Sequence, residues 1–139
     1  MMKFRIWDKK KKKWIRKDEK NLIYPVITPD GHVMILEFSA FDDSATVIDE
    51  GSRFEINFFT GLRDVNGKEI YEGDIVKCFS PLWKRQFLNE ETVGVIIFER
   101  GCFKVKTEKA LLAITECNCL AIVGNIYETH ELLKEVSHV

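Results

Sequence analysis

Two carboxylates around one glycine come nearest to a catalytic pattern in this sequence. Glu72 and Asp74 flank Gly73, and paired carboxylates serve acid–base chemistry or bind a divalent cation. A calcium loop, however, needs a longer series of oxygen ligands than this turn supplies. Turn chemistry explains the same residues, because glycine frees the backbone and aspartate bonds to neighbouring amides. The sequence therefore favours a structural turn, and a small hydrolase or nuclease using both carboxylates is the less favoured hypothesis.

No other pattern in the sequence points to catalysis. None of the five serines stands in a Gly-x-Ser-x-Gly elbow. Gly61, Gly67 and Gly73 are spaced by six residues, which fits neither a phosphate-binding loop nor a dinucleotide fingerprint. We therefore expect a protein that is not an enzyme and that has no cofactor.

The four cysteines leave a metal site open as an alternative. Zinc is usually held by two close pairs of ligands, and the one close pair here is Cys117 and Cys119. Cys78 and Cys102 stand alone in apolar runs, where cysteine usually behaves as a small hydrophobic residue. Free thiols in a reducing compartment are the expectation.

Basic residues are concentrated at the start of the chain. Residues 1–20 carry ten Lys and Arg against three acids, whereas residues 21–139 carry eleven against nineteen. Most of the excess comes from the run Lys9–Lys13. This run is interpreted first as a solvated hairpin turn, with two alternatives: attachment to phosphate groups, or pairing with the acidic body of a second copy in an oligomer.

Aromatic residues accompany the basic ones in two places, a composition typical of single-strand nucleic-acid binding. The same aromatics suit a protein contact or a packed loop anchor equally well. The candidate interaction surface comprises Trp7, Lys10, Lys11, Lys12, Trp14, Trp83, Lys84 and Arg85.

Short alternating segments separated by turns predict the elements that position these residues. Residues 3–8 and 14–16 form an expected hairpin around the lysine run, while residues 21–57 give a vague pattern in which Pro25 is a turn signal. Asn66-Gly67 is a strong hairpin signal. The later expected strands are 75–79, 92–98, 102–106 and 120–127, the last with a bend at Gly124; residues 110–115 are undecided between strand and helix, and residues 129–137 predict a short helix.

These elements predict a mostly β protein of 139 residues. The hydrophobic share of 45% is that of a globular chain. No apolar run reaches the roughly 20 residues that span a membrane. The opening residues carry no secretory signal, so the expected location is the bacterial cytoplasm.

From residue 59 onward the chain resembles the YopX family, small proteins of bacteriophages and prophages in Gram-positive hosts. The resemblance is carried by residues 59–76, which hold Gly61, Asn66-Gly67 and Tyr71-Glu72-Gly73-Asp74, and by residues 93–98 and 123–128. Residues 3–8, with the lysines and Trp14, also resemble the family's opening. One departure is His130, where the family pattern has a proline.

The resemblance implies an architecture more than an activity. It implies an SH3-like barrel over residues 58–139, closed by the terminal helix, after an N-terminal hairpin and irregular β region over 1–57. It also implies self-association, and no catalytic residue is carried over from it. The expected function is that of a phage accessory protein in the host cytoplasm: a homo-oligomeric interaction module, with a host protein as an open partner and nucleic-acid binding as the alternative.

Overall fold

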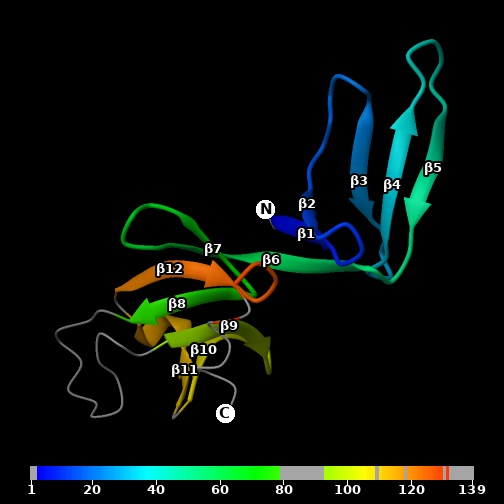
Figure 1. Ribbon diagram of the computed structural model, residues 1–139. Helices are drawn as coiled ribbons and strands as arrows, with labels where there is room; N and C mark the ends of the chain where they lie inside the picture. The colour runs from blue at the N-terminus through cyan, green and yellow to red at the C-terminus, as the bar shows by residue number, and fades with distance from the viewer. Residues whose placement is uncertain (1–2, 79–92, 109, 118, 130, 132–139) are drawn as a thin grey trace. The chain divides into compact units, whose positions relative to one another are not determined.

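The computed structural model describes residues 3–78, 93–108, 110–117, 119–129 and 131. These residues form twelve β-strands and one 3₁₀ turn, Ile114–Glu116, with no α-helix in the described part (Figure 1). The predicted mostly β class is therefore confirmed. The helix expected over 129–137 falls almost wholly outside the described residues. None of the described helices has the length and apolarity to cross a membrane.

The chain divides into two compact units, each described here by itself. Residues 4–56 form the N-terminal unit, and residues 1–3 together with 57–139 form the C-terminal unit. The strand β6 (Phe54–Arg63) begins in the first unit and continues in the second. In sequence terms, the N-terminal unit is an insertion between the third residue and the rest of the C-terminal unit.

The N-terminal unit opens with the hairpin that the sequence predicts. Strand β1 (Phe4–Asp8) pairs antiparallel with β2 (Lys13–Ile15), and Trp7 lies opposite Trp14 in this register. The lysine run forms the connection, in which Lys12 adopts a positive φ of 53°. The turn assigned to these lysines is therefore confirmed.

A three-stranded antiparallel sheet follows, in the order β3-β4-β5 (Figure 1). Its strands are β3 (Ile23–Ile27), β4 (Val33–Phe38) and β5 (Ala45–Glu50). The β4–β5 register shifts between Ile35 and Leu36, so the sheet contains one irregularity. The assignment of Pro25 to a turn is wrong, because Pro25 pairs with Ile35 within β3. A proline is tolerated there because β3 is an edge strand. On its unpaired side, no backbone N–H is needed to hydrogen-bond a neighbouring strand.

Alternation of side chains builds the core of this unit. Val33 and Ile35 point inward from β4, and they pack with Ile6 and Phe54. Burial of each such side chain contributes about 1.5–3 kcal/mol. The core thereby ties the hairpin of β1 and β2 to the three-stranded sheet.

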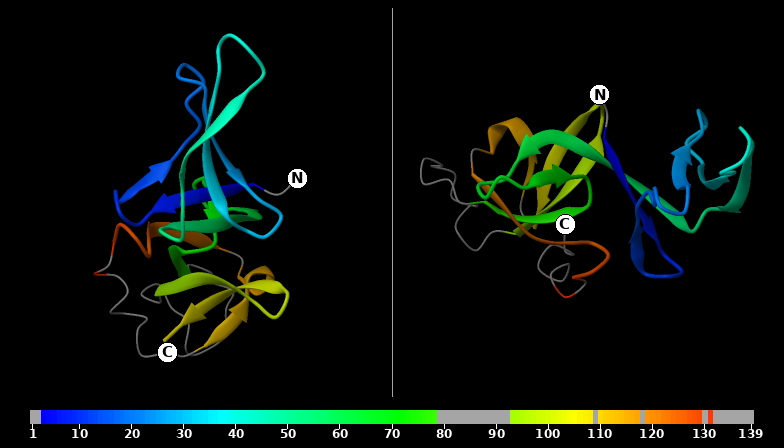
Figure 2. Two further views of the ribbon diagram at one scale, coloured as in Figure 1. Left: turned by 90° about the vertical axis from the view of Figure 1, so that its right-hand side faces the viewer. Right: turned by 90° about the horizontal axis from the view of Figure 1, so that it is seen from above.

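The C-terminal unit holds a five-stranded antiparallel sheet, curled in Figure 2, in the order β11-β10-β9-β8-β12. β6 also pairs with β7 (Glu69–Tyr71) in this unit. The sheet strands are β8 (Asp74–Cys78), β9 (Val93–Glu99), β10 (Cys102–Thr107), β11 (Leu111–Ala113) and β12 (Leu120–Asn125). The bend expected at Gly124 is confirmed, since the β12 register shifts between Ile122 and Gly124. Residues 110–115, left undecided above, divide between β11 and the 3₁₀ turn.

The inner side of this sheet is closely packed. Val76, Ile96 and Val105 are at most 1% exposed and form its core with Ile70. A β-carbon at Gly94 would lie 2.5 Å from Val105 Cγ1. The strand β9 therefore needs a residue without a side chain at this point so that β10 can approach.

Asp64 links the β6–β7 turn to β12. Its Oδ1 accepts the amides of Asn66 and Lys68, each at 2.9 Å, and its Oδ2 accepts the amide of Ile122 at 3.0 Å. Burial alone would raise the pKa of Asp64, but these amides and the Lys68 charge outweigh it and leave the pKa below its ordinary value. The Asp-x-Asn-Gly-Lys string thus has a structural role across three strands.

Candidate interaction site

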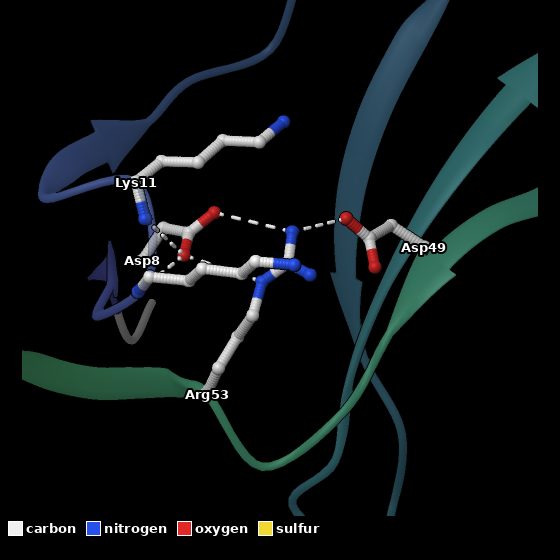
Figure 3. Close-up of polar contacts among 5 residues, drawn as sticks. Asp8, Lys11, Asp49 and Arg53 are labelled. Carbon is white, nitrogen blue, oxygen red and sulfur yellow. Dashed lines mark hydrogen bonds and ion pairs between the residues drawn. The ribbon is translucent and has the colours of Figure 1, made fainter.

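A buried carboxylate organises the basic turn of the N-terminal unit. The Asp8 side chain is fully buried, and its Oδ1 accepts the amides of Lys10 at 2.9 Å and Lys11 at 3.1 Å. Figure 3 shows the Lys11 side chain extending away from this carboxylate. The backbone of the lysine run is thereby fixed, while Lys10 to Lys13 stay exposed and Lys9 pairs with Glu55 at 3.2 Å.

Arg53 neutralises two carboxylates at once. Its Nη2 donates to Asp8 Oδ2 at 3.3 Å and forms a short ion pair with Asp49 Oδ2 (Figure 3). Its Nε lies 3.2 Å from Asp8 Oδ1 without hydrogen-bond alignment. Burial alone would raise the pKa of Asp8, but the Lys11 and Lys10 amides and the Arg53 guanidinium bring it below its ordinary value. Asp8 is therefore a stable anion inside the unit.

Beside this ion pair lies an open cavity of about 500 Å³, called the groove below. Its volume falls within the roughly 300–1,000 Å³ typical of binding pockets. Apolar side chains line much of it, among them Trp14, Ile35 and Phe54. An apolar group entering the groove would therefore lose its hydration against apolar surface.

The charges of the groove are unevenly matched. Two of its acids, Asp8 and Asp49, form ion pairs with Arg53. The third, Asp18, accepts hydrogen bonds from the backbone and side-chain N–H groups of Asn21. Its cations are Lys11, Lys13 and Arg16. These three are exposed, and no described carboxylate lies within ion-pair distance of them. The groove thus offers three cations without a described carboxylate partner, and one carboxylate, Asp18, that is hydrogen-bonded to the neutral Asn21, around an apolar lining.

Of the two tryptophans in the hairpin, Trp7 is buried and Trp14 lines the groove. Trp7 is only 6% exposed, so the expectation that it presents a surface aromatic is wrong. Its ring packs edge-on against Trp14, with centroids 4.9 Å apart. The Arg5 guanidinium lies 4.3 Å from the centre of the Trp14 ring. Trp14 therefore enters the groove as a ring already held by its neighbours.

The loop between β4 and β5 presents the most exposed aromatic residue described. Phe41 is 97% exposed, and Asp42 and Asp43 follow it in the chain. Ser39 Oγ accepts the Phe41 amide at 3.1 Å, while Asp42 Oδ1 accepts the Ser44 amide at 2.8 Å. These bonds give the loop, residues 39–44 and called the acidic tip below, a defined shape.

The other residues of the sequence-based site divide into three groups. Lys10, Lys11 and Lys12 lie together on the turn of the N-terminal unit, next to Trp14 in the hairpin. Trp83, Lys84 and Arg85 lie outside the described residues. The motif residues of the resemblance lie in the C-terminal unit: Gly61, Asn66, Gly67, Tyr71, Glu72, Gly73 and Asp74.

The Tyr-Glu-Gly-Asp residues form a tight junction. Asp74 is 2% exposed and its Oδ2 accepts the Tyr71 amide at 2.8 Å. Gly73, at a φ of +87°, donates its amide to Ile96 and accepts from the Ile126 amide. These three hydrogen bonds fit the structural turn that the sequence favours. Among the described residues no three His, Cys, Asp or Glu side chains gather as metal ligands do.

Sequence analysis missed Asp8, Arg53 and the acidic tip. Asp8 carried a local signal, because aspartate before a turn commonly accepts amides two or three residues ahead. The pairing of Arg53 with Asp8 has no such signal, since the two residues are 45 positions apart. Phe41 stood out only as an aromatic residue among serine and aspartate.

Comparison with known proteins gives one family and several similar structures, two of which are described here. A family model described as YopX protein matches residues 3–134. The crystal structure of protein EF1440 from Enterococcus faecalis is 22% identical, with a TM-score of 0.62 over 96% of this chain and 98% of that one. The structure of protein yopX from Bacillus subtilis is 20% identical, with a TM-score of 0.56 over 94% and 96%. No curated protein matches.

Proposed function

The chain belongs to the YopX family, and from its N-terminal unit we propose that it is a non-enzymatic, self-associating protein-interaction module. The observation that carries the proposal is the surface of that unit. It presents a groove with unpaired cations and, on a separate loop, an exposed aromatic flanked by acids. Exposed apolar residues rimmed by charges are typical of protein-binding surfaces.

The β4–β5 hairpin adds apolar surface to the acidic tip. Phe38 is 40% exposed and Val47 is 45% exposed. Phe38 packs edge-on against Tyr24 at 5.6 Å between ring centroids, which limits the freedom of both rings. Ordered aromatic groups lose little entropy on binding, so they suit a contact surface.

Sedimentation velocity of the untagged chain over a wide concentration range tests self-association. The expected result is a concentration-dependent shift to larger species. A single monomeric species at every concentration would remove self-association from the proposal. Native mass spectrometry of the same sample then reports any bound host protein or nucleic acid by its excess mass.

Nucleic-acid binding is the second candidate, favoured by the unpaired ammonium groups of Lys10, Lys11 and Lys12. The burial of Trp7 counts against a stacking platform there. Binding of labelled single-stranded DNA should fall steeply with salt and with replacement of the three lysines by glutamate. Salt-independent or absent binding would reject this candidate.

The remaining parts of the proposal concern the C-terminal unit and the setting. We propose an SH3-like barrel for that unit, supported by its curled five-stranded sheet, and a cytoplasmic phage or prophage accessory role. The non-enzymatic assignment is supported by the turn bonds of Asp74. A hydrolytic activity that is lost in a Glu72→Gln, Asp74→Asn variant with an intact fold would contradict it.

A further inference from the structure

We propose that the groove of one copy binds the acidic tip of a second copy, with Phe41 entering between Lys11, Lys13 and Arg16. This inference rests on the self-association proposed above and names its contact. The groove and the tip are different surfaces, so the contact is of the head-to-tail type. Such contacts close as a reciprocal pair or as a ring, or they extend as a chain.

The chemistry of the groove matches that of the tip. The groove combines an apolar lining with three exposed cations that lack a described carboxylate partner. The tip combines an apolar side chain with Asp42 and Asp43 directly after it. Opposite charges at the rim steer and orient the contact, while burial of the aromatic ring supplies its stability.

The tip keeps its charge and its shape before binding. Asp42 accepts hydrogen bonds from the side chain and the amide of Ser44, and these hold its pKa below the ordinary value. The Phe41 amide is held by Ser39. A preorganised loop loses less entropy on binding than a flexible one.

The tip does not occupy the groove of its own copy, because Phe41 is 97% exposed and is not among the residues that line the groove. Ile35 lines the groove, and Phe41 follows it by six residues along β4 and its loop. At about 3.3 Å per residue, Phe38 already lies roughly 10 Å further along the strand. Figure 1 shows the loop of β4 and β5 at the end of this sheet away from β2. The groove of each copy is therefore open to the tip of another copy.

Two variants separate the two halves of the contact. Phe41→Ala removes the tip anchor, and its 97% exposure means that no packing in its own chain is lost. Lys11→Glu with Arg16→Glu reverses the charge of the groove at two exposed positions. Each variant of the full chain should raise the dissociation constant of self-association at least about tenfold, measured by sedimentation velocity.

Mixing the two variants gives the sharpest test. Phe41→Ala retains an intact groove and the charge-reversed variant retains an intact tip, so one contact can form between them. We expect each variant alone to be largely monomeric and the equimolar mixture to form a 1:1 heterodimer in native mass spectrometry. A mixture that stays monomeric overturns the head-to-tail contact.

Two matched controls test the specificity of these effects. Val65→Ala removes an apolar side chain that is 56% exposed in the C-terminal unit. Lys12→Glu reverses a charge in the same turn at a residue that does not line the groove. Both controls should associate as the unchanged chain does. An effect of Lys12→Glu equal to that of the groove variant overturns the contact and favours diffuse electrostatic attraction between copies.

The failure of this contact and the failure of self-association give different results. If the unchanged chain associates and Phe41→Ala associates equally well, the proposed contact is wrong and self-association uses another surface. If the unchanged chain is monomeric at every concentration, both proposals are wrong. Each outcome follows from the same sedimentation series.

Discussion

At the scale of single residues, two buried aspartates hold turns in place, because their charged carboxylates accept several hydrogen bonds. Asp8 and Asp64 are at most 7% exposed, and each accepts several backbone amides. A carboxylate that accepts two or three amides stays ionised even when it is buried. These two residues therefore fix turns that the apolar core alone would leave loosely defined.

Replacing Asp8 by asparagine should destabilise the chain by about 2–3 kcal/mol near pH 7, because hydrogen bonds to a buried charge are lost. The folded-state pKa of Asp8 lies below its ordinary value of 3.8. Its stabilising contribution is therefore complete above about pH 4 and is lost as the pH falls through the folded pKa. Urea unfolding at pH 7 and pH 3 should show a difference between the two proteins that shrinks at pH 3.

Asp30→Asn, at an exposed turn residue, is the control for this comparison. It should unfold as the unchanged chain does at both pH values. An Asp8→Asn difference that persists undiminished at pH 3 would show that packing, not charge, is responsible.

The glycines at two turns allow two costs of substitution to be separated: the strain of a positive φ and the clash of an added side chain with a neighbour. Gly73 and Gly67 have φ values of +87° and +81°. A β-carbon at Gly73 would lie 3.2 Å from Asn57 Oδ1, whereas none of the atoms around Gly67 lies within 4 Å of such a carbon. Gly67→Ala should cost about 1 kcal/mol and Gly73→Ala about 2 kcal/mol or more in thermal unfolding. Equal losses of stability in the two variants would mean that the Asn57 side chain moves away from the new β-carbon at no cost in free energy.

At the scale of elements, the sequence predicted the turns and bends that depend on residues close to one another in the chain. The lysine turn, the Asn66-Gly67 hairpin and the Gly124 bend depend on residues close in sequence, and all three are found. β3 was missed because Pro25 normally ends a strand and is admitted only at an edge. The groove could not be foreseen, because it requires β2 to lie beside residues of β4 and β5.

Asp64 gives the test of how elements of the C-terminal unit are linked. Asp64→Ala removes the acceptor for the Ile122 amide in β12. Hydrogen exchange of residues 120–125 should become at least about tenfold faster, because the local opening free energy falls. The core strand β9 should be affected less. Uniform acceleration through both strands would indicate global destabilisation instead of a local link.

At the scale of the whole molecule, the charges at both ends of the proposed contact make association sensitive to salt. The screening length falls from about 10 Å at 0.1 M salt to about 3 Å at 1 M. Raising sodium chloride across that range should weaken self-association several-fold in sedimentation velocity. Phe41→Ala, which leaves the charges in place, should weaken association at both salt concentrations. Association that is unchanged by salt would exclude a role for Lys11, Lys13 and Arg16.

The insertion of residues 4–56 into the C-terminal unit has a consequence for synthesis on the ribosome. Lys3 is made before every residue of the inserted unit, yet its carbonyl accepts the amide of Phe59 and its ammonium pairs with Glu69 at 3.0 Å. All residues of the inserted unit exist well before β12, whose last residue is Asn125. At about 5–20 residues per second, translation from residue 56 to that point takes roughly 3–14 s. Lys3 is therefore fixed in the C-terminal unit only after the unit that follows it in sequence has been completely translated.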